Sequence, residues 1–302
     1  MKDKKLPLIY FFAVSCMLIW GLSFVFTRII LDVYSPVTAV FMRMLISSAI
    51  LIPLILIYRR NEHFGTKDWL LIMLAAVFEP FFYFLGENYG ILETSSTISA
   101  VIIATIPLLT PIAAYYMLKE KLSWLNITGV FISFSGIVIM LVGKDLSLNA
   151  SPKGILFLFF AVFSAIISTI IMKKLSSKFS SLTIIGYQNL LGGLYFLPLF
   201  LIFDFKQFLS IPFDPKVWAT ILFLAVFASS LAFIMYVSVI RHLGASRSNI
   251  FTNIIPVSTA IFSFFILDEQ FTFIKVLGIA IVITGVMLSQ FNRLLLHIKS
   301  RR

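Results

Sequence analysis

The sequence predicts an all-α polytopic membrane protein in which ten transmembrane helices form two inverted five-helix repeats. Of the 302 residues, 60% are hydrophobic and only 12% are charged, whereas charged residues make up about 25% of a soluble domain. Apolar runs of about 20 residues recur along the whole chain, and each can cross a hydrocarbon core about 30 Å thick. A residue pattern in the first half also returns in the second half, which indicates an internal duplication.

The duplication is visible as residue pairs that keep a constant spacing. At an offset of 149 residues the matched pairs are Trp69 and Trp218, Pro107 and Pro256, Glu120 and Glu269, Ser123 and Thr272, Gly129 and Gly278, and Gly136 and Gly285. Further upstream the offset is 145 residues, and the pairs are Arg28 and Lys173, Thr38 and Thr183, Arg43 and Gln188, and Pro53 and Pro198. We therefore predict one five-helix repeat over residues 1–149 and a second over residues 150–302.

The expected spans cover residues 8–29, 35–58, 69–91, 95–118, 124–143, 154–173, 181–203, 217–240, 245–267 and 273–291. Because each repeat has an odd number of spans, the second repeat enters the membrane from the opposite side, and the repeats are inverted. Pro107, Pro111 and Pro256 lack an amide donor and are expected to free backbone carbonyls beside a cavity or a helix contact. Close helix approach is expected at Gly129, Gly136, Gly192, Gly193, Gly278 and Gly285.

The distribution of positive charge predicts the orientation. When ten spans are assumed, most of the 24 Lys and Arg residues fall on the side of the N-terminus. Positive loops mark the cytoplasmic side, so both termini are predicted to be cytoplasmic. The net charge of +11 has the same explanation and does not indicate a nucleic-acid partner. The first apolar run follows Met1–Lys5 without a small-residue cleavage site, so we expect an uncleaved first span.

Three ionisable residues, Arg43, Glu79 and Glu87, fall within the predicted spans. A charge inside the bilayer is costly, so such residues normally face a cavity or one another. Arg43 lies roughly 12 Å from the outer end of its span, and Glu79 lies roughly 15 Å from the inner end of its own. We expect these two side chains at similar depth in a shared cavity; the alternative is an ion pair that only joins two helices. Glu87 lies nearer the outer surface, where a carboxylate in contact with water is the alternative.

Other polar side chains extend the candidate site. Glu79, Tyr83 and Glu87 recur every four residues, which places them in a polar stripe along one side of the third span. Asn249 and Asn253 have the same spacing on the ninth span, where Asn needs a cavity or a partner helix. The complete set of predicted solute-binding residues is Trp20, Ser23, Arg43, Glu79, Tyr83, Glu87, Tyr187, Gln188, Tyr236, Asn249 and Asn253.

The sequence offers no motif for catalysis or for a cofactor. It has no phosphate-binding loop, no HExxH motif and a single cysteine, and its three His residues fall in loops or at the tail. An intramembrane enzyme would need a nucleophile or a set of metal ligands at one depth, and none is evident. We therefore expect no enzyme activity, no cofactor and no bound metal.

Several short segments together resemble a known family. They are WGLSF at residues 20–24 with Arg28, Pro36 with FMR at 41–43, IP at 106–107 with EKL at 120–122, and the looser copy DEQ at 268–270. Lys119 stands where the third segment usually has Gly. In this combination, and over essentially the whole chain, the sequence resembles the ten-helix EamA-type permeases of the drug/metabolite transporter superfamily.

The resemblance implies a carrier of small molecules in the inner (plasma) membrane. Spans 1–4 and 6–9 would form a central cavity, and the peripheral spans five and ten would be available for a homodimer contact. Family members move amino acids, other metabolites or drugs, often outward. We expect secondary-active export of an amino-acid-like or amphipathic metabolite by alternating access, with Arg43 for a carboxylate and Glu79 as the acceptor if protons are coupled. A facilitative exchanger of the same fold and a non-transporting scaffold or sensor remain alternatives.

Overall fold

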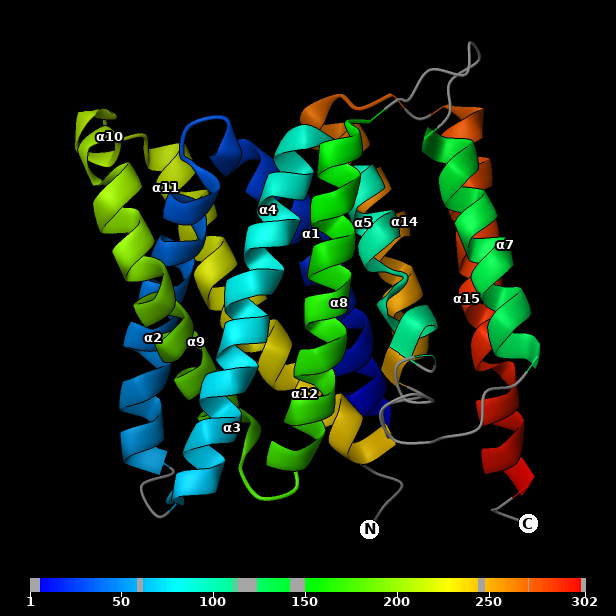
Figure 1. Cartoon of the computed structure of the whole chain (residues 1–302), viewed down its shortest axis with the longest axis horizontal. Helices are drawn as coiled ribbons and strands as arrows, with labels where there is room; N and C mark the ends of the chain where they lie inside the picture. The colour runs from blue at the N-terminus through cyan, green and yellow to red at the C-terminus, as the bar shows by residue number, and fades with distance from the viewer. Residues whose placement is uncertain are drawn as a thin grey trace.

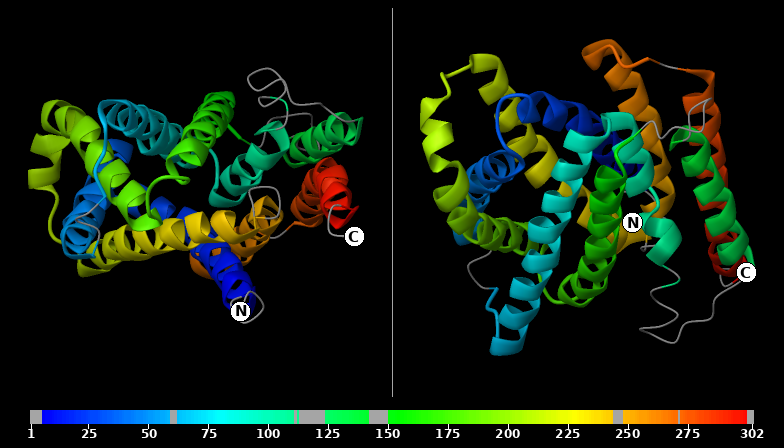
Figure 2. Two further views of the ribbon diagram at one scale, coloured as in Figure 1. Left: turned by 90° about the horizontal axis from the view of Figure 1, so that it is seen from below. Right: turned by 45° about the horizontal axis from the view of Figure 1, so that its top comes forward.

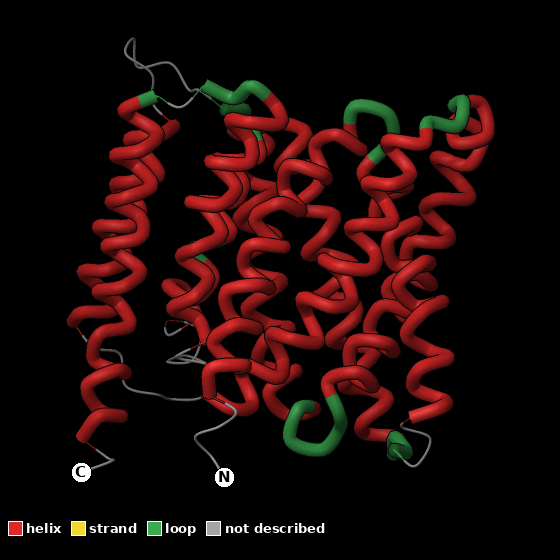
Figure 3. Tube along the Cα trace, turned by 180° about the vertical axis from the view of Figure 1, so that it is seen from behind, coloured by secondary structure: helices red, strands yellow, loops and turns green. Residues whose placement is uncertain are grey.

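The computed structural model describes residues 6–58, 62–110, 112, 124–141, 150–243, 248–270 and 272–299. These residues form a bundle of helices joined by short loops, and none of them lies in a β-strand (Figures 1 and 3). Six apolar helices are long enough to cross a membrane, namely Pro7–Leu31, Pro36–Tyr58, Thr66–Glu93, Pro152–Met172, Ser181–Ser210 and Pro215–Leu243. Four shorter apolar helices are Ser96–Thr110, Ile127–Leu141, Phe251–Leu267 and Phe273–Ser289. The described residues therefore confirm a polytopic all-helical fold, while ten spans remain a prediction.

Several of the long helices contain a change of helical type. The helices of the first half are α1 (Leu6–Leu31), α2 (Pro36–Tyr58), α3 (Thr66–Ala76), η2 (Val77–Phe82), α4 (Tyr83–Glu93), α5 (Ser96–Ile103) and α7 (Trp124–Leu141). Those of the second half are α8 (Pro152–Leu175), α9 (Ser181–Leu199), η3 (Phe200–Asp204), α10 (Phe205–Ser210), α11 (Pro215–Phe223), η4 (Leu224–Ala232), α12 (Phe233–Leu243), η5 (Asn249–Asn253), α14 (Ile254–Leu267) and α15 (Phe273–Lys299). The segments η2, η3 and η4 are π-helical, and η5 is a 3-10 helix.

Helices of the two halves pack directly on each other. The most extensive contacts pair α1 with α14, α2 with α9, α4 with α8, and α7 with α15, so each joins a first-half helix to a second-half helix. The main hydrophobic core accordingly draws on both halves of the chain. Helix α1 begins and α15 ends at the same end of the bundle (Figure 1). The two halves of the chain therefore pack against each other along most of their helices, and a functional site is expected between them.

The pair of α7 and α15 stands at one edge of the bundle (Figures 1 and 2). Glycines bring these two helices together: a Cβ atom on Gly129 would lie 2.5 Å from the carbonyl oxygen of Gly285. A Cβ atom on Gly136 would lie 2.8 Å from the carbonyl oxygen of Gly278. The close approach predicted at these four glycines is therefore confirmed.

The helices change near two of the three prolines singled out in the sequence. Helix α5 ends at Ile103, and a two-residue turn separates it from the helical residues around Pro107. At the equivalent place in the second half, η5 gives way to α14 at Ile254, two residues before Pro256. Both changes agree with the loss of a backbone donor at proline. Pro111 lies outside the described residues.

Two helix starts are capped by a carboxylate from the opposite half. Asp204 accepts hydrogen bonds from the hydroxyl of Ser35 and, at 3.2 and 2.8 Å, from the amide and hydroxyl of Thr38, where α2 begins. At the other end of the bundle, Glu62 accepts from the amide of Ser180 at 3.1 Å, where α9 begins. A carboxylate at a helix N-terminus satisfies free amides and favours the helix dipole. We call these contacts the Asp204 cap and the Glu62 cap.

A further contact between the halves involves the second copy of the EKL-like segment. Glu269 accepts from the amide of Ser96 at 3.1 Å and from the hydroxyl of Thr97 at 2.8 Å, at the start of α5. Its predicted counterpart Glu120 lies outside the described residues.

Candidate functional site

A π-helical segment interrupts the long helix from Thr66 to Glu93, drawn in cyan in Figure 1. Pro80 has no backbone N–H, and the residue before a proline is driven towards an extended conformation. Glu79 accordingly has φ −146° and ψ 118° inside η2. The carbonyl oxygen of Glu79 accepts a hydrogen bond from Nε2 of Gln188 on α9. This feature was not predicted, although the Glu79–Pro80 dipeptide could have indicated it.

The second half has a π-helical segment at the matching position. The offset that aligns Trp69 with Trp218 carries Glu79 to Ala228, inside η4. There the carbonyl oxygen of Ala228 accepts from Nε1 of Trp20 at 3.2 Å. Segments of this kind are rare and often occur at functional sites. If the chain is duplicated as predicted, the π segments η2 and η4 occupy matching positions in the two halves.

Arg43 lies on α2 and is only 3% exposed. Its Nε and Nη2 atoms donate to the hydroxyl of Ser229 in η4, at 3.3 and 3.2 Å. Its Cζ atom lies 4.6 Å from the centre of the Phe84 ring, which is cation–π geometry. A π segment of the second half thus holds the predicted cation of the first half.

Glu87 is the carboxylate whose charge acts on Arg43. Glu87 is 6% exposed, so the alternative of a carboxylate in contact with water is wrong. It accepts a hydrogen bond from the hydroxyl of Tyr83 at 2.6 Å, and its charge and that of Arg43 are within electrostatic reach of each other. The ion pairs of the described residues do not include one between Arg43 and Glu79. The buried ion pair considered for those two residues is therefore not the arrangement found.

A small cavity lies beside these groups. Its lining residues are Glu79, Pro80, Phe84, Ile185, Gln188, Asn189 and Phe233. The volume within which the centre of a water molecule can move is about 10 Å³. The cavity therefore has room for about one water molecule. The described residues thus leave a small space beside polar groups, which a metabolite cannot enter without a movement of the helices.

Aromatic rings cover one side of this region. Trp20 makes edge-to-face contacts with Phe233 and Tyr236, at ring-centre distances of 4.9 and 5.0 Å. Of the other predicted residues, Ser23 donates back to the carbonyl of Trp20 at 2.7 Å. Tyr187 packs against Phe64 and Trp69 in a separate hydrophobic cluster. Asn253 is buried on η5, and the side chain of Asn249 lies outside the described residues.

A chain of buried polar side chains beside the cavity was not predicted. Asn189 donates to the hydroxyl of Ser47 at 2.6 Å and to the carbonyl oxygen of Ser229 at 2.9 Å. The hydroxyls of Ser47 and Ser230 are 2.6 Å apart. These contacts join α2, α9 and η4. Ser and Asn within apolar runs were the available signal, because such side chains bond across membrane helices.

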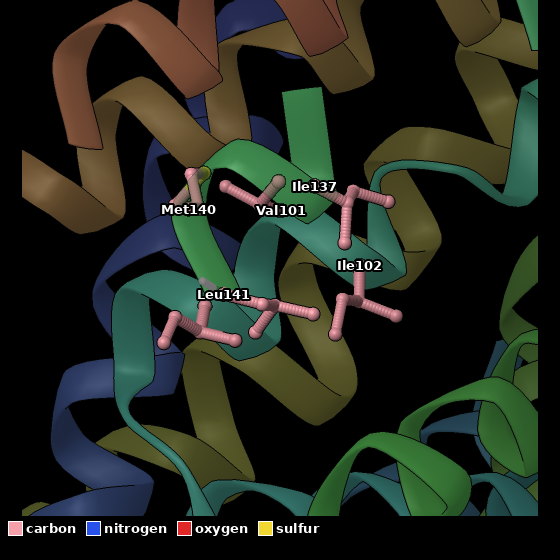
Figure 4. Close-up of a pocket in the computed structure, with 6 residues that line it drawn as sticks. Val101, Ile102, Ile137, Met140 and Leu141 are labelled. Carbon is pink, nitrogen blue, oxygen red and sulfur yellow. The ribbon is translucent and has the colours of Figure 1, made fainter. Parts of the chain in front are cut away.

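A second space, between α5 and α7, is entirely apolar. Figure 4 shows its lining by Val101, Ile102, Ile137, Met140 and Leu141. With hydrocarbon and thioether side chains alone, it offers no group that could orient a polar solute. Among the described residues, His, Cys, Asp and Glu form no group of three or more that could hold a metal ion. The polar cavity beside Arg43 is therefore the candidate site.

Comparisons with known proteins agree with this architecture. The EamA-like transporter family model matches the chain twice, over residues 7–142 and 152–291. The uncharacterized transporter YetK of Bacillus subtilis (strain 168) is 30% identical over 295 residues, which cover 96% of this chain and 89% of that protein. An uncharacterized transporter of Archaeoglobus fulgidus is 25% identical over 275 residues, covering 90% of this chain and 94% of its own.

A solved crystal structure shares the fold. It superposes with a TM-score of 0.69 at 13% identity and covers 95% of this chain and 99% of its own. The family match spans most of the sequence, and the relatives are named transporters. The chain is therefore a multi-pass membrane transporter that belongs to the EamA-like transporter family.

Proposed function

We propose that this protein is a secondary-active transporter that exports a small amino-acid-like or amphipathic metabolite by alternating access. The observation that supports this most is the buried polar site itself. Arg43, Glu79 and Glu87 sit within apolar helices, where unused charge is costly. Glu79 lines the small cavity, and Arg43 packs on Phe84, another of its lining residues. A solute that needs these groups accounts for their presence better than helix packing does.

The proposed architecture is a pair of inverted repeats, residues 1–149 and 150–302. The two family matches, the equivalent π segments and the Asp204 and Glu62 caps at opposite ends all support it. In such transporters the site lies near the midplane, where interrupted helices meet, and one repeat rocks against the other. The protein then sits in the plasma membrane with both termini cytoplasmic.

The chemistry of the site fits a solute with a carboxylate and an apolar body. A guanidinium binds a carboxylate through paired N–H donors, and Arg43 supplies that group. The rings of Trp20, Phe233 and Tyr236 offer apolar contact. Glu79 lines the cavity and is the proposed proton acceptor.

The small size of the cavity supports alternating access. Room for about one water molecule excludes a bound metabolite in the present arrangement. The helices must therefore part on one side to admit the solute and on the other to release it.

The test is uptake of the standard L-amino acids, each radiolabelled, into proteoliposomes. We expect wild-type protein to move at least one of them faster than empty liposomes do, and a pH gradient to accelerate it. Glu79→Gln should remove the response to the gradient, and Arg43→Gln should weaken uptake of the same solute. Uptake that ignores the gradient contradicts proton coupling and favours the exchanger. Uptake equal to that of empty liposomes for every amino acid contradicts the proposed solute class.

A further inference from the structure

The side chains of Gln188 and Asn189, neighbours on α9, each reach a different π segment. Gln188 donates through Nε2 to the carbonyl oxygen of Glu79 in η2. Asn189 donates through Nδ2 to the carbonyl oxygen of Ser229 in η4, at 2.9 Å. One helix of the second half therefore ties together the irregular backbones of both halves.

Each of these carbonyls belongs to a residue of the candidate site. Glu79 lines the cavity. The hydroxyl of Ser229 accepts hydrogen bonds from Nε and Nη2 of Arg43. A shift of the Glu79 carbonyl moves the Glu79 side chain with it, since both are fixed to one Cα atom. A shift of Ser229 moves the anchor of Arg43 in the same way.

The packing leaves little freedom around these bonds. Gln188 and Asn189 are both buried. One turn along α9, a Cβ atom on Gly192 would lie 2.2 Å from Cγ of Pro80, so α9 touches η2 directly. The second N–H of Asn189 is used as well, because it donates to Ser47 at 2.6 Å. One N–H of the Gln188 amide is used by the Glu79 carbonyl, so this bond fixes the orientation of the amide at the cavity wall.

We propose that Gln188 and Asn189 are positioning residues of the solute site: Gln188 fixes Glu79 in one half, and Asn189 fixes Arg43 in the other through Ser229. This role differs from the direct solute contact that the sequence suggested for Gln188. It rests on the proposed transport function, because Glu79 and Arg43 are the groups that would meet the solute. Through these two side chains, α9 fixes the positions of Glu79 and Arg43 relative to each other.

The first readout needs no solute. Hydrogen exchange is measured on the full chain in lipid nanodiscs, with Gln188→Met and Asn189→Leu, which keep approximate size and remove the donor. We expect Gln188→Met to raise the amide exchange rate about tenfold in residues 77–83. Asn189→Leu should do the same in residues 224–233. In each case the cause is the loss of a buried hydrogen bond. Leu194→Met, at an exposed position of the same helix, should change neither segment. If Gln188→Met does not fold, Gln188→Leu, which also has no donor, replaces it.

The second readout separates positioning from general packing. For the amino acid that wild-type protein moves, Gln188→Met should raise KM about tenfold with little change in kcat. The double variant Gln188→Met, Glu79→Gln should be little worse than Glu79→Gln alone, because residues that act through each other are not additive. Fully additive effects, or unchanged exchange in both segments, overturn the proposal. If no amino acid is moved while exchange follows the expected pattern, the transport function falls and the two backbone contacts stand.

Discussion

Arg43 illustrates how a charge becomes tolerable inside an apolar bundle. Its guanidinium has the Ser229 hydroxyl on one edge and the Phe84 ring on its face, and the Glu87 carboxylate acts on it from within electrostatic reach. A buried cation without such partners would be strongly destabilising. The contacts come from two other segments, α4 and η4, so the charge also reports on whether these are correctly assembled against α2.

Replacing Ser229 by Ala removes the oxygen that accepts two N–H groups of Arg43. We expect Ser229→Ala to lower the free energy of unfolding by about 1 to 3 kcal/mol, the usual effect of leaving a buried donor without its partner. Chemical unfolding in detergent, followed by Trp fluorescence, measures it. Ser135→Ala is the matched control, because Ser135 is exposed and bonds only within its own helix, to the carbonyl of Ile132. Equal stability of the two variants would argue against the anchoring role.

At this scale the sequence was informative about charges and poor about their partners. Arg43, Glu79 and Glu87 stand out because ionisable side chains are rare in apolar runs. Ser229 and Asn189 do not stand out, because small polar residues are common in membrane helices and their partners depend on how distant helices cross. Tyr187 was grouped with Gln188, yet adjacent helical positions point about 100° apart, and Tyr187 packs in another cluster.

Two kinds of local backbone feature shape the helices. Proline interrupts them, as at Pro80 and before Pro107, and glycine brings them together, as between α7 and α15. The glycine contacts were predictable from their spacing alone. The π segment η4 was not predictable, because it has no proline. Its position is explained only by the predicted match to η2 in the first half.

The close approach of α7 and α15 predicts a strong effect for the smallest substitution. Gly136→Ala places a Cβ atom 2.8 Å from the Gly278 carbonyl oxygen, which forces the helices apart. Overpacking of this kind typically costs about 1 to 3 kcal/mol, and thermal unfolding of the purified protein should detect it. Gly65→Ala is the control, because its Cβ atom would have only an ordinary contact, 3.5 Å from Asp68. If both variants unfold at the wild-type temperature, the helices are not held at this distance.

A homodimer formed through the peripheral pair α7 and α15 remains a prediction. Measuring the molecular mass of wild-type protein and of Gly136→Ala in detergent tests it.

Taken as a whole, the molecule encloses its candidate site between two halves that cap each other. Asp204 of the second half caps α2 at one end, and Glu62 of the first half caps α9 at the other. The chain's composition predicted the membrane bundle, because so apolar a sequence has no soluble alternative. Composition could not predict that the cavity is too small for a metabolite, since the balance between wider and narrower forms depends on small differences between large packing terms.

The caps predict opposite effects on access to the cavity. In a chain whose single cysteine, Cys16, is replaced by Ala, Ile185→Cys places one thiol in the cavity lining. Adding Asp204→Asn should speed labelling from the end where α2 begins, by about tenfold, because it weakens hydrogen bonds to a charged group. Adding Glu62→Gln should do so from the opposite end. Labelling that responds equally to both changes from one end would show that the caps do not control separate entrances.

The most direct test of alternating access uses the same single-cysteine chain without changes to the caps. Sealed vesicles of both orientations are treated with a membrane-impermeant thiol reagent, and modification of Cys at position 185 is followed by mass spectrometry. Two halves that open in turn predict modification from either side of the membrane, with protection by a transported amino acid. Modification from one side only, or from neither, would contradict the account.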